Sequence, residues 1–332
     1  MEISRESIFI SSIRVFFNTF FAIIAVAVAV IPIIIISLIF STPENHFNLK
    51  NKLEILPDLE GNTKILPMST PCVLRVDIKG EIGKQQVTSE DIYYQLIESR
   101  KGRLKHNRVK AILLNVNSGG GHAIVSDIIY RNLISYKEKF NVPIYTYIEG
   151  VCASGGYYIA CSSDKIYSTP LGMTGSVGVF FGPFFNFKKL MDKVGVNSKT
   201  ISDGENKLTL NPFDTWTEDE GKYLQSITNY TYDTFLNIVA SSRKIDKEKL
   251  INDYGAKVFN TKEALKIQYI DKVSSYNEAL EDLLKEANID TQKPYQVVTL
   301  KSKKAWLHPM LQSSKVSFKS FLKEYLITLI KN

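Results

Sequence analysis

The longest uninterrupted apolar block in this chain of 332 residues lies near its amino terminus. Residues 20–40 carry no charge, and the uncharged window widens to 15–43. A helix rises about 1.5 Å per residue, so 20–40 would be about 31 Å long and would match a bilayer core. A cleavable signal peptide has a shorter apolar region and a small-x-small site, and neither is present. We therefore expect an uncleaved transmembrane anchor over 15–43, after a short segment over 1–14.

The pattern changes twice beyond the anchor. Residues 44–70 contain two prolines and little periodicity, which predicts a tether. From Cys72 onward, short apolar runs alternate with segments of helical periodicity. The predicted strands are 72–78, 109–116, 142–148 and 165–168, and the predicted helices are 89–101, 124–136 and 154–162. Strands that are apolar throughout indicate parallel strands covered on both faces, so we expect an α/β domain over 71–290.

One serine stands among small residues where the third predicted strand turns into a helix, in the sequence VCASGGYY. This position would place the Ser154 hydroxyl at a helix amino terminus, where unpaired N–H groups favour negative charge. The small neighbours Ala153, Gly155 and Gly156 would let a substrate carbonyl approach the backbone. The alternative is that Ser154 only caps the helix and the glycines only permit close packing.

A second strand-to-helix turn has a similar composition, NVNSGGG at residues 115–121. Glycine-rich turns at this place present N–H groups to anions, so two of them in one sheet favour an oxyanion site. The glycine patterns of dinucleotide and phosphate loops are absent from the sequence.

A nucleophilic serine also needs a base. Of the four histidines, His46, His106, His122 and His308, only His122 lies near this chemistry. A desolvated lysine is the other option, but with 41 Lys and Arg residues the spacing alone selects none.

The net charge of +7 belongs mainly to the carboxyl-terminal segment, 291–332, which contains seven lysines after residue 298. Because the body is nearly neutral, we expect no nucleic-acid partner. The apolar residues between Phe318 and Ile330 recur at helical spacing with lysines along one flank. Such a helix would lie on an anionic membrane surface, or would pack against the body or a neighbouring subunit.

Cysteine usage gives no sign of a disulfide framework or a metal centre. Cys72, Cys152 and Cys161 are odd in number, and no Cys or His spacing suggests zinc. We read the three thiols as small buried side chains and expect no metal and no cofactor.

Four segments occur in the order and approximate spacing of a known family: NSGGG, ASGGYYIA, TGSVGV at 174–179 and SDGENKLTLNPF at 202–213. Over about residues 70–280 the chain resembles the signal peptide peptidase A family, also called protease IV, in its short, single-repeat branch. The resemblance implies a membrane-anchored serine peptidase with a Clp-protease/crotonase-like α/β fold of repeated ββα units.

The resemblance also implies a site. Ser154 looks like the nucleophile and Lys207 like the general base of a Ser-Lys dyad, with the amides of Gly120 and Gly155 as the oxyanion hole. Lys199 and Lys222 stay candidates, because Asn206 replaces the tyrosine that usually precedes the family's lysine. Gly119 replaces the usual proline of the first turn. The residues expected to line the substrate groove are Gly119, Gly121, Gly175, Ser176 and Val177.

Further expectations follow from the same resemblance. The substrates would be hydrophobic peptides such as signal-peptide remnants, and like subunits would form a ring in which serine and lysine come from neighbouring protomers. The protein would cross the inner membrane once, with its amino terminus in the cytoplasm and the catalytic domain on the outer, periplasmic side. The five phenylalanines between 180 and 187 would line an apolar groove, or would pack between subunits or in the core.

Two other functions stay open on the sequence alone. One is a membrane scaffold that has the fold but no activity. The other is a crotonase-like acyl-thioester enzyme that uses the two glycine turns, although the membrane anchor and the absence of a recognisable adenine-nucleotide motif argue against it.

Overall fold

The computed structural model describes residues 8–40, 52–84, 87–204, 206–217 and 219–301, in two units that divide after Lys50. In the first unit, helix α1 spans Ile8–Phe40. Its window Ile13–Val30 is long and apolar enough to cross a membrane, by length and composition. The expected anchor over 15–43 therefore falls on a helix as far as Phe40, and its last residues lie outside the described part.

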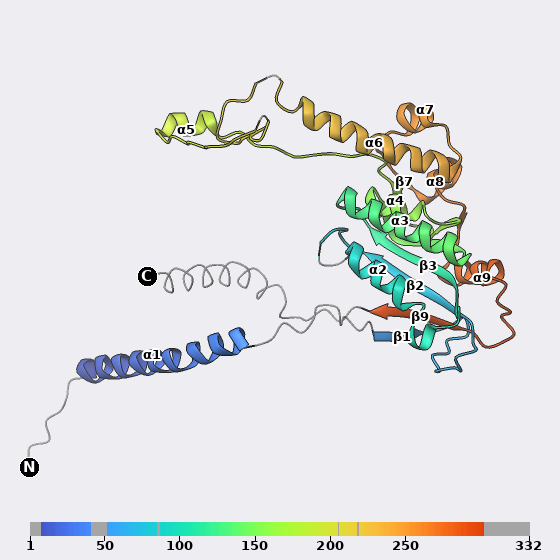
Figure 1. Cartoon of the computed structure of the whole chain (residues 1–332), viewed down its shortest axis with the longest axis horizontal. Helices are drawn as coiled ribbons and strands as arrows, with labels where there is room; N and C mark the ends of the chain where they lie inside the picture. The colour runs from blue at the N-terminus through green and yellow to red at the C-terminus, as the bar shows by residue number, and fades with distance from the viewer. Residues whose placement is uncertain (1–7, 41–51, 85–86, 205, 218, 302–332) are drawn as a thin grey trace, which may run out of the picture. The chain divides into compact units, whose positions relative to one another are not determined.

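A mixed sheet, nine-stranded among the described residues, forms the centre of the second unit (Figure 1), and its main path runs in the order β1-β9-β2-β3-β4-β5-β8. Neighbours from β9 through β2, β3, β4 and β5 to β8 are parallel, and β1 is antiparallel to β9. Off this path, β6 lies parallel to β4 and antiparallel to β7. The strands are β1 (Lys52–Leu56), β2 (Cys72–Lys79), β3 (Val109–Ser118), β4 (Ile144–Ala153), β5 (Lys165–Ser168), β6 (Met173–Gly175), β7 (Val258–Asn260), β8 (Lys272–Val273) and β9 (Gln296–Lys301).

Helices connect and cover these strands. Those of the second unit are α2 (Ser89–Glu98), α3 (Ala123–Phe140), α4 (Gly155–Ala160), α5 (Lys188–Val194), α6 (Lys222–Arg243), α7 (Lys247–Lys249), α8 (Thr261–Lys266) and α9 (Tyr276–Glu286). Short 3-10 and π segments lie at Gly102–Leu104 and Leu250–Tyr254. Local capping sets several starts: the Thr88 hydroxyl accepts from the amide of Asp91 at α2, and Ser275 and Glu278 form a capping box at α9.

The central strands are buried on both faces, which explains why their sequences are continuously apolar. On one face, side chains such as Leu74, Ile112 and Ile144 pack with residues of α2, α3, α4 and α6. On the other face, Val73 and Leu113 pack with the apolar side of α9. The prediction of an α/β domain with parallel strands is confirmed.

The expected domain boundaries need correction at both ends. The tether expected over 44–70 contains β1, and the tail expected over 291–332 contains β9, which lies between β1 and β2 in the sheet. Val297 and Val298 are fully or almost fully buried, so β9 belongs to the core. The amphipathic stripe from Phe318 to Ile330 lies outside the described residues.

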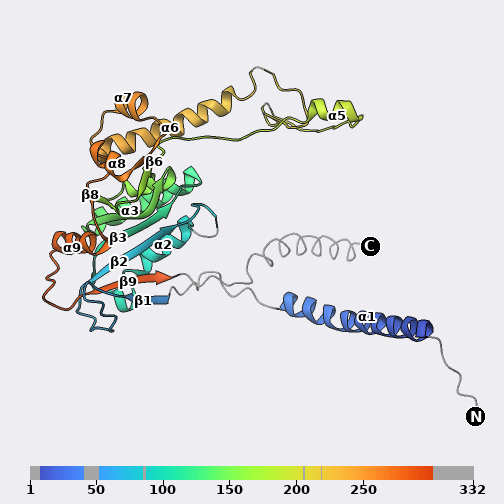
Figure 2. The same cartoon turned by 180° about the vertical axis from the view of Figure 1, so that it is seen from behind.

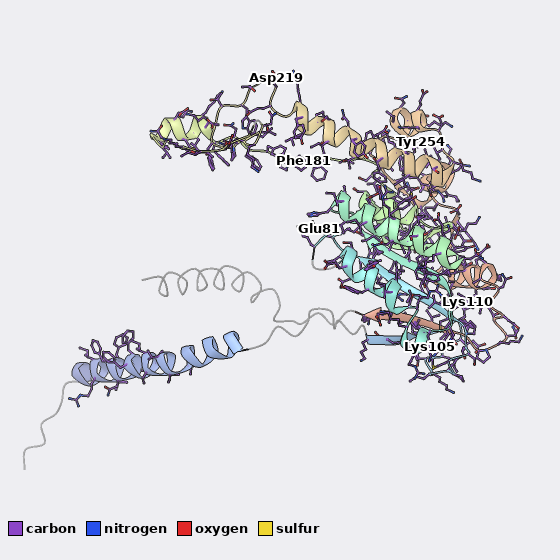
Figure 3. All side chains as sticks on the ribbon, viewed as in Figure 1. Glu81, Lys105, Lys110, Phe181, Asp219 and Tyr254 are labelled. Carbon is purple, nitrogen blue, oxygen red and sulfur yellow. The ribbon has the colours of Figure 1, made fainter. Side chains whose placement is uncertain are left out.

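Residues 179–221, here called the arm, project away from the sheet and its helices in both views (Figures 1 and 2). The arm contains α5, and its two sides are joined where the amide of Phe187 donates to the carbonyl of Pro212 at 2.7 Å. Phe181 and Asp219 mark the arm in Figure 3. The phenylalanines at 180, 181, 184, 185 and 187 are 43–84% exposed, so they do not contribute to the core of their own chain.

The position of β9 makes a prediction about truncation. A chain of residues 52–290 loses the buried side chains of Val297, Val298 and Leu300, each worth about 1.5–3 kcal/mol, against a total stability of about 5–15 kcal/mol. We expect this chain to show no cooperative thermal unfolding by circular dichroism. The matched chain 52–301 retains β9 and should unfold cooperatively, and equal transitions for the two would contradict the assignment of β9 to the core.

Candidate active site

Ser154 occupies the junction between β4 and α4 in a backbone conformation that is rare for serine, with φ 51° and ψ −122°. Two hydrogen bonds hold it there: its amide donates to the carbonyl of Gly175 at 2.9 Å, and its carbonyl accepts from the amide of Tyr158 at 2.9 Å. The predicted strand ended at residue 148, but β4 continues to Ala153 because its last residues pair with β6 rather than β5.

The next helix is fixed by the tyrosines on its buried side. The Tyr157 hydroxyl donates to the carbonyl of Tyr269 at 2.9 Å, and the Tyr158 hydroxyl donates to the carboxylate of Asp127 on α3 at 2.6 Å. Burial, together with that carboxylate, raises the pKa of Tyr158, so its phenol stays protonated and remains a donor. Ser154 therefore begins a helix whose position is anchored to α3 and to the residues before β8.

The glycine turn after β3 packs directly against Ser154. Gly120 has φ +107°, and a Cβ on it would lie 2.8 Å from the Ser154 Cβ and 2.9 Å from the Gly155 nitrogen. Gly121 has φ +154°, and a Cβ there would lie 2.1 Å from the carbonyl oxygen of Ile82. The two turns identified from sequence therefore meet, at a separation that leaves no room for a side chain.

The hydrogen bonds of this turn determine which amides are free. The Gly120 amide donates to the Ser118 hydroxyl at 3.1 Å. Ile82 pairs with the turn through its amide to the Gly120 carbonyl, 3.0 Å, and its carbonyl to the His122 amide, 2.9 Å. Among the described residues, this pairing gives the Gly121 amide no hydrogen-bond acceptor. A Cβ on Gly155 would lie 3.4 Å from the Gly121 nitrogen. The Gly155 amide is in the first turn of α4 and has no intrahelical acceptor.

These contacts bear on the expected oxyanion donors Gly120 and Gly155. The Gly120 amide already has an acceptor, whereas the amide one residue later, on Gly121, lies close to Gly155. Sequence reasoning put Gly121 in the substrate groove instead. It also missed Ser118 and Ile82, which hold the turn; Ser118 was visible as the last polar side chain before the glycines.

Of the remaining groove candidates, Gly175, Ser176 and Val177 belong to the β6 side of Ser154, and Gly119 belongs to the glycine turn. Ala153 is in register with Gly175, so Ser176 lies next to Ser154, and it has the same φ of 51°. Val177 as a whole residue is 1% exposed, so this expected groove residue is buried in the described part of the chain. Gly119 faces open space, since nothing lies within 4 Å of a Cβ placed on it.

The lysine candidates are not brought to Ser154 within one chain. Lys207 and Lys199 are exposed on the arm, and the Lys222 ammonium pairs with Asp219 at the start of α6. On the body, Lys257 lies two strands from Ser154 and its ammonium donates to the carbonyl of Asp253 at 3.4 Å. Over the described residues, the Ser154 hydroxyl makes no hydrogen bond.

The other candidate nucleophiles and ligands are also placed. Burial raises the pKa of Cys161 to about 12 and that of Cys72 to about 11, and it also raises the pKa of Cys152, so the thiols stay protonated. All three cysteines are free and buried, as expected. In the described ranges, no group of three or more His, Cys, Asp or Glu residues could hold a metal ion.

Comparison with known proteins identifies the class to which this fold and site belong. The model of peptidase family S49 matches residues 137–290. "Putative signal peptide peptidase SppA" from Enterococcus faecium is 31% identical over 238 residues, which cover 71% of this chain and 67% of that protein. "Protease 4" from Haemophilus influenzae is 28% identical over 237 residues, but these cover only 35% of its length. The chain belongs to peptidase family S49, and the resemblance seen in the sequence is confirmed.

Two solved structures are similar to the chain at 18% identity. The match to a mutant of ClpP1 from Listeria monocytogenes covers 64% of this chain and 96% of the ClpP1 chain, with a TM-score of 0.40. The match to a mutant of the 1510-N membrane-bound stomatin-specific protease covers 70% of this chain and 99% of that protein's chain, with a TM-score of 0.42.

The close contact between the glycine turn and Ile82 can be tested by two alanine variants. Gly121→Ala forces a Cβ onto the backbone of Ile82, so we expect the free energy of unfolding to fall by about 2–4 kcal/mol. Gly119→Ala meets open space and should change it by less than about 1 kcal/mol. Urea unfolding of both variants measures the difference, and equal losses would show that the turn does not pack on Ile82.

Proposed function

We propose that this protein is a membrane-anchored serine endopeptidase in which Ser154 is the nucleophile. The observation that carries the proposal is the meeting of two turns. A Cβ on Gly120 would lie 2.8 Å from the Ser154 Cβ, and a Cβ on Gly155 would lie 3.4 Å from the Gly121 nitrogen. The Ser154 hydroxyl has no hydrogen-bond partner among the described residues. Membership of a peptidase family supports this assignment.

The proposed reaction has two stages. The Ser154 Oγ attacks the peptide carbonyl carbon while a neutral lysine amine takes the hydroxyl proton. The carbonyl oxygen becomes negatively charged and accepts hydrogen bonds from the Gly121 and Gly155 amides, which are present before the charge develops. The carbon–nitrogen bond then breaks, and the leaving amine receives the proton from the lysine. Water, activated by the same lysine, hydrolyses the acyl ester and releases Ser154.

We propose Lys207 as that lysine, supplied by the arm of a neighbouring copy. In one chain the arm extends away from the end of the sheet that carries Ser154 (Figures 1 and 2). Its apolar side chains, such as Phe180 at 84% and Ile201 at 86% exposure, are left open by the described residues. Packing the arm against a second copy would bury them and would complete the site. The Ser176 hydroxyl, next to Ser154, would be a second hydrogen-bond partner for the incoming lysine amine.

The substrate class follows from the same surfaces. A peptide in extended conformation would run past the glycine turn, and the exposed phenylalanines of the arm would favour apolar peptides such as signal-peptide remnants. We propose that α1 anchors the protein in the cell membrane in a single pass, with the amino terminus inside and the peptidase domain, residues 52–301, outside.

Mixing two inactive variants tests the proposed dyad. Ser154→Ala and Lys207→Ala should each abolish hydrolysis of a fluorogenic apolar peptide. In a ring where each serine uses the lysine of its neighbour, an equal mixture of the two, unfolded and reassembled together, regains about a quarter of wild-type activity, because one site in four combines an intact serine with an intact lysine. Each variant taken alone through the same procedure is the control.

Each other outcome of this experiment has a defined meaning. No regain from a mixture that has assembled to the wild-type size would place serine and lysine in one chain. Retained activity of Lys207→Ala would transfer the base to another residue, with Lys199→Ala and Lys222→Ala as the next variants. Retained activity of Ser154→Ala would end the proposal of Ser154 as nucleophile.

A further inference from the structure

Ser118 occupies the last position of β3 and connects three parts of the candidate site. Its hydroxyl donates to the carbonyl of Gly80, after β2, at 2.6 Å and accepts from the amide of Gly120 at 3.1 Å. The residue is 2% exposed. A Cβ on Gly156 of α4 would lie 3.0 Å from the Ser118 carbonyl oxygen, so the main chain of Ser118 also packs on the helix that follows Ser154.

We propose that Ser118 is a positioning residue for oxyanion stabilisation, an inference that rests on the proposed function. The turn it precedes has three successive glycines and no side chain that could hold its conformation. Glycine has the largest backbone freedom of any residue, so such a turn needs external restraint to keep an amide aimed at one point. The Ser118 hydroxyl supplies this restraint from the strand side.

The restraint reaches Gly121 through a closed set of hydrogen bonds. The Ser118 hydroxyl accepts from the Gly120 amide, and the Gly120 carbonyl accepts from the Ile82 amide. Ile82 in turn accepts from His122, so Gly121 is held between two fixed residues. Because Gly80 is joined to Ser118, the loop that carries Ile82 and the glycine turn are linked at both ends. Glu81 marks this loop in Figure 3.

A structural role and a positioning role of the Ser118 hydroxyl have different measurable consequences. If Ser118 only stabilises the fold, its removal lowers the free energy of unfolding and leaves the turnover of the folded protein unchanged. If it aims the Gly121 amide, its removal weakens an interaction made with the oxyanion, and not with the bound peptide. That loss appears in kcat and leaves KM nearly unchanged.

Ser118→Ala in the full-length protein is the direct test. We expect kcat for an apolar peptide to fall by about 10- to 100-fold with KM within about twofold, since loss of one oxyanion donor costs about 100- to 1000-fold. Inhibition by a hydrophobic peptide aldehyde, whose hemiacetal with Ser154 carries the oxyanion, should weaken by a similar factor. Binding of the same peptide ending in a carboxamide should stay unchanged.

Ser99→Ala is the matched control. Ser99 is also fully buried, and its hydroxyl makes two short contacts, with the carbonyl of Leu96 at 2.6 Å and the hydroxyl of Tyr136 at 2.8 Å, at the end of α2. Its loss should lower the free energy of unfolding and leave kcat within about twofold. Ser118→Cys places a somewhat larger thiol, a weaker donor and acceptor, at the same position, and its kcat should lie between those of wild type and Ser118→Ala.

The outcomes separate the two proposals. Wild-type kcat and aldehyde inhibition in Ser118→Ala overturn the positioning role while leaving the peptidase proposal intact. If Ser118→Ala does not fold, Ser118→Cys decides, and a wild-type kcat in that variant overturns the role. No turnover and no aldehyde inhibition in the assembled wild-type protein overturns the proposed function, and the role of Ser118 falls with it.

Discussion

The site depends on one steric constraint: the backbone of the turn after β3 lies directly against the β4–α4 junction. The constraint is visible at Gly120, where a single added carbon would come within 3.0 Å of three atoms of residues 153–155. Parallel pairing of β3 with β4 brings both turns to the same edge of the sheet, and glycine lets them touch. The backbone of the glycine turn then lies directly beside Ser154 and the Gly155 amide, with no side chain between them.

The rest of the body supports this contact. The Ser154 backbone is held in an unfavourable region, and such a conformation persists only where the surroundings over-determine it. The Gly175 carbonyl of β6 accepts from the Ser154 amide. The hydroxyls of Tyr157 and Tyr158 hold α4 to Tyr269 and Asp127. The loop that carries Ile82 packs against the glycine turn. The chain therefore places its strain at the residue that we propose to be the nucleophile.

Much of the body could be predicted from sequence because its signals are local. The strand at 165–168 and the alternation of apolar runs with helices are direct consequences of burial on both faces. The strand β9 was missed because it pairs with β2 and β1, which lie more than 200 residues earlier, and β6 and β7 were missed because three residues carry no periodicity. The choice between Gly120 and Gly121 depends on the hydrogen bond that the Gly120 amide donates to the Ser118 hydroxyl, which no spacing encodes.

In our proposal, the residues of the arm act only in contact with a second copy of the chain. Its sequence, rich in phenylalanine, indicated either a groove or a packing surface, and the structure shows these rings exposed on a projection that carries Lys207 and Lys199. In the proposed function the lysine reaches Ser154 from a second copy, so the motif around Lys207 does not encode the distance between the two residues. Ser154 and the two glycine turns, in contrast, come together within one chain.

The reactivity of the Ser154 hydroxyl is the most direct measure of this account. A biotinylated fluorophosphonate added to the assembled full-length protein should form one adduct, located by peptide mass mapping on residues 150–165, and the adduct should be absent from Ser154→Ala. An adduct on another serine, or peptide hydrolysis that continues while Ser154 stays unmodified, would contradict the assignment of Ser154 as the nucleophile.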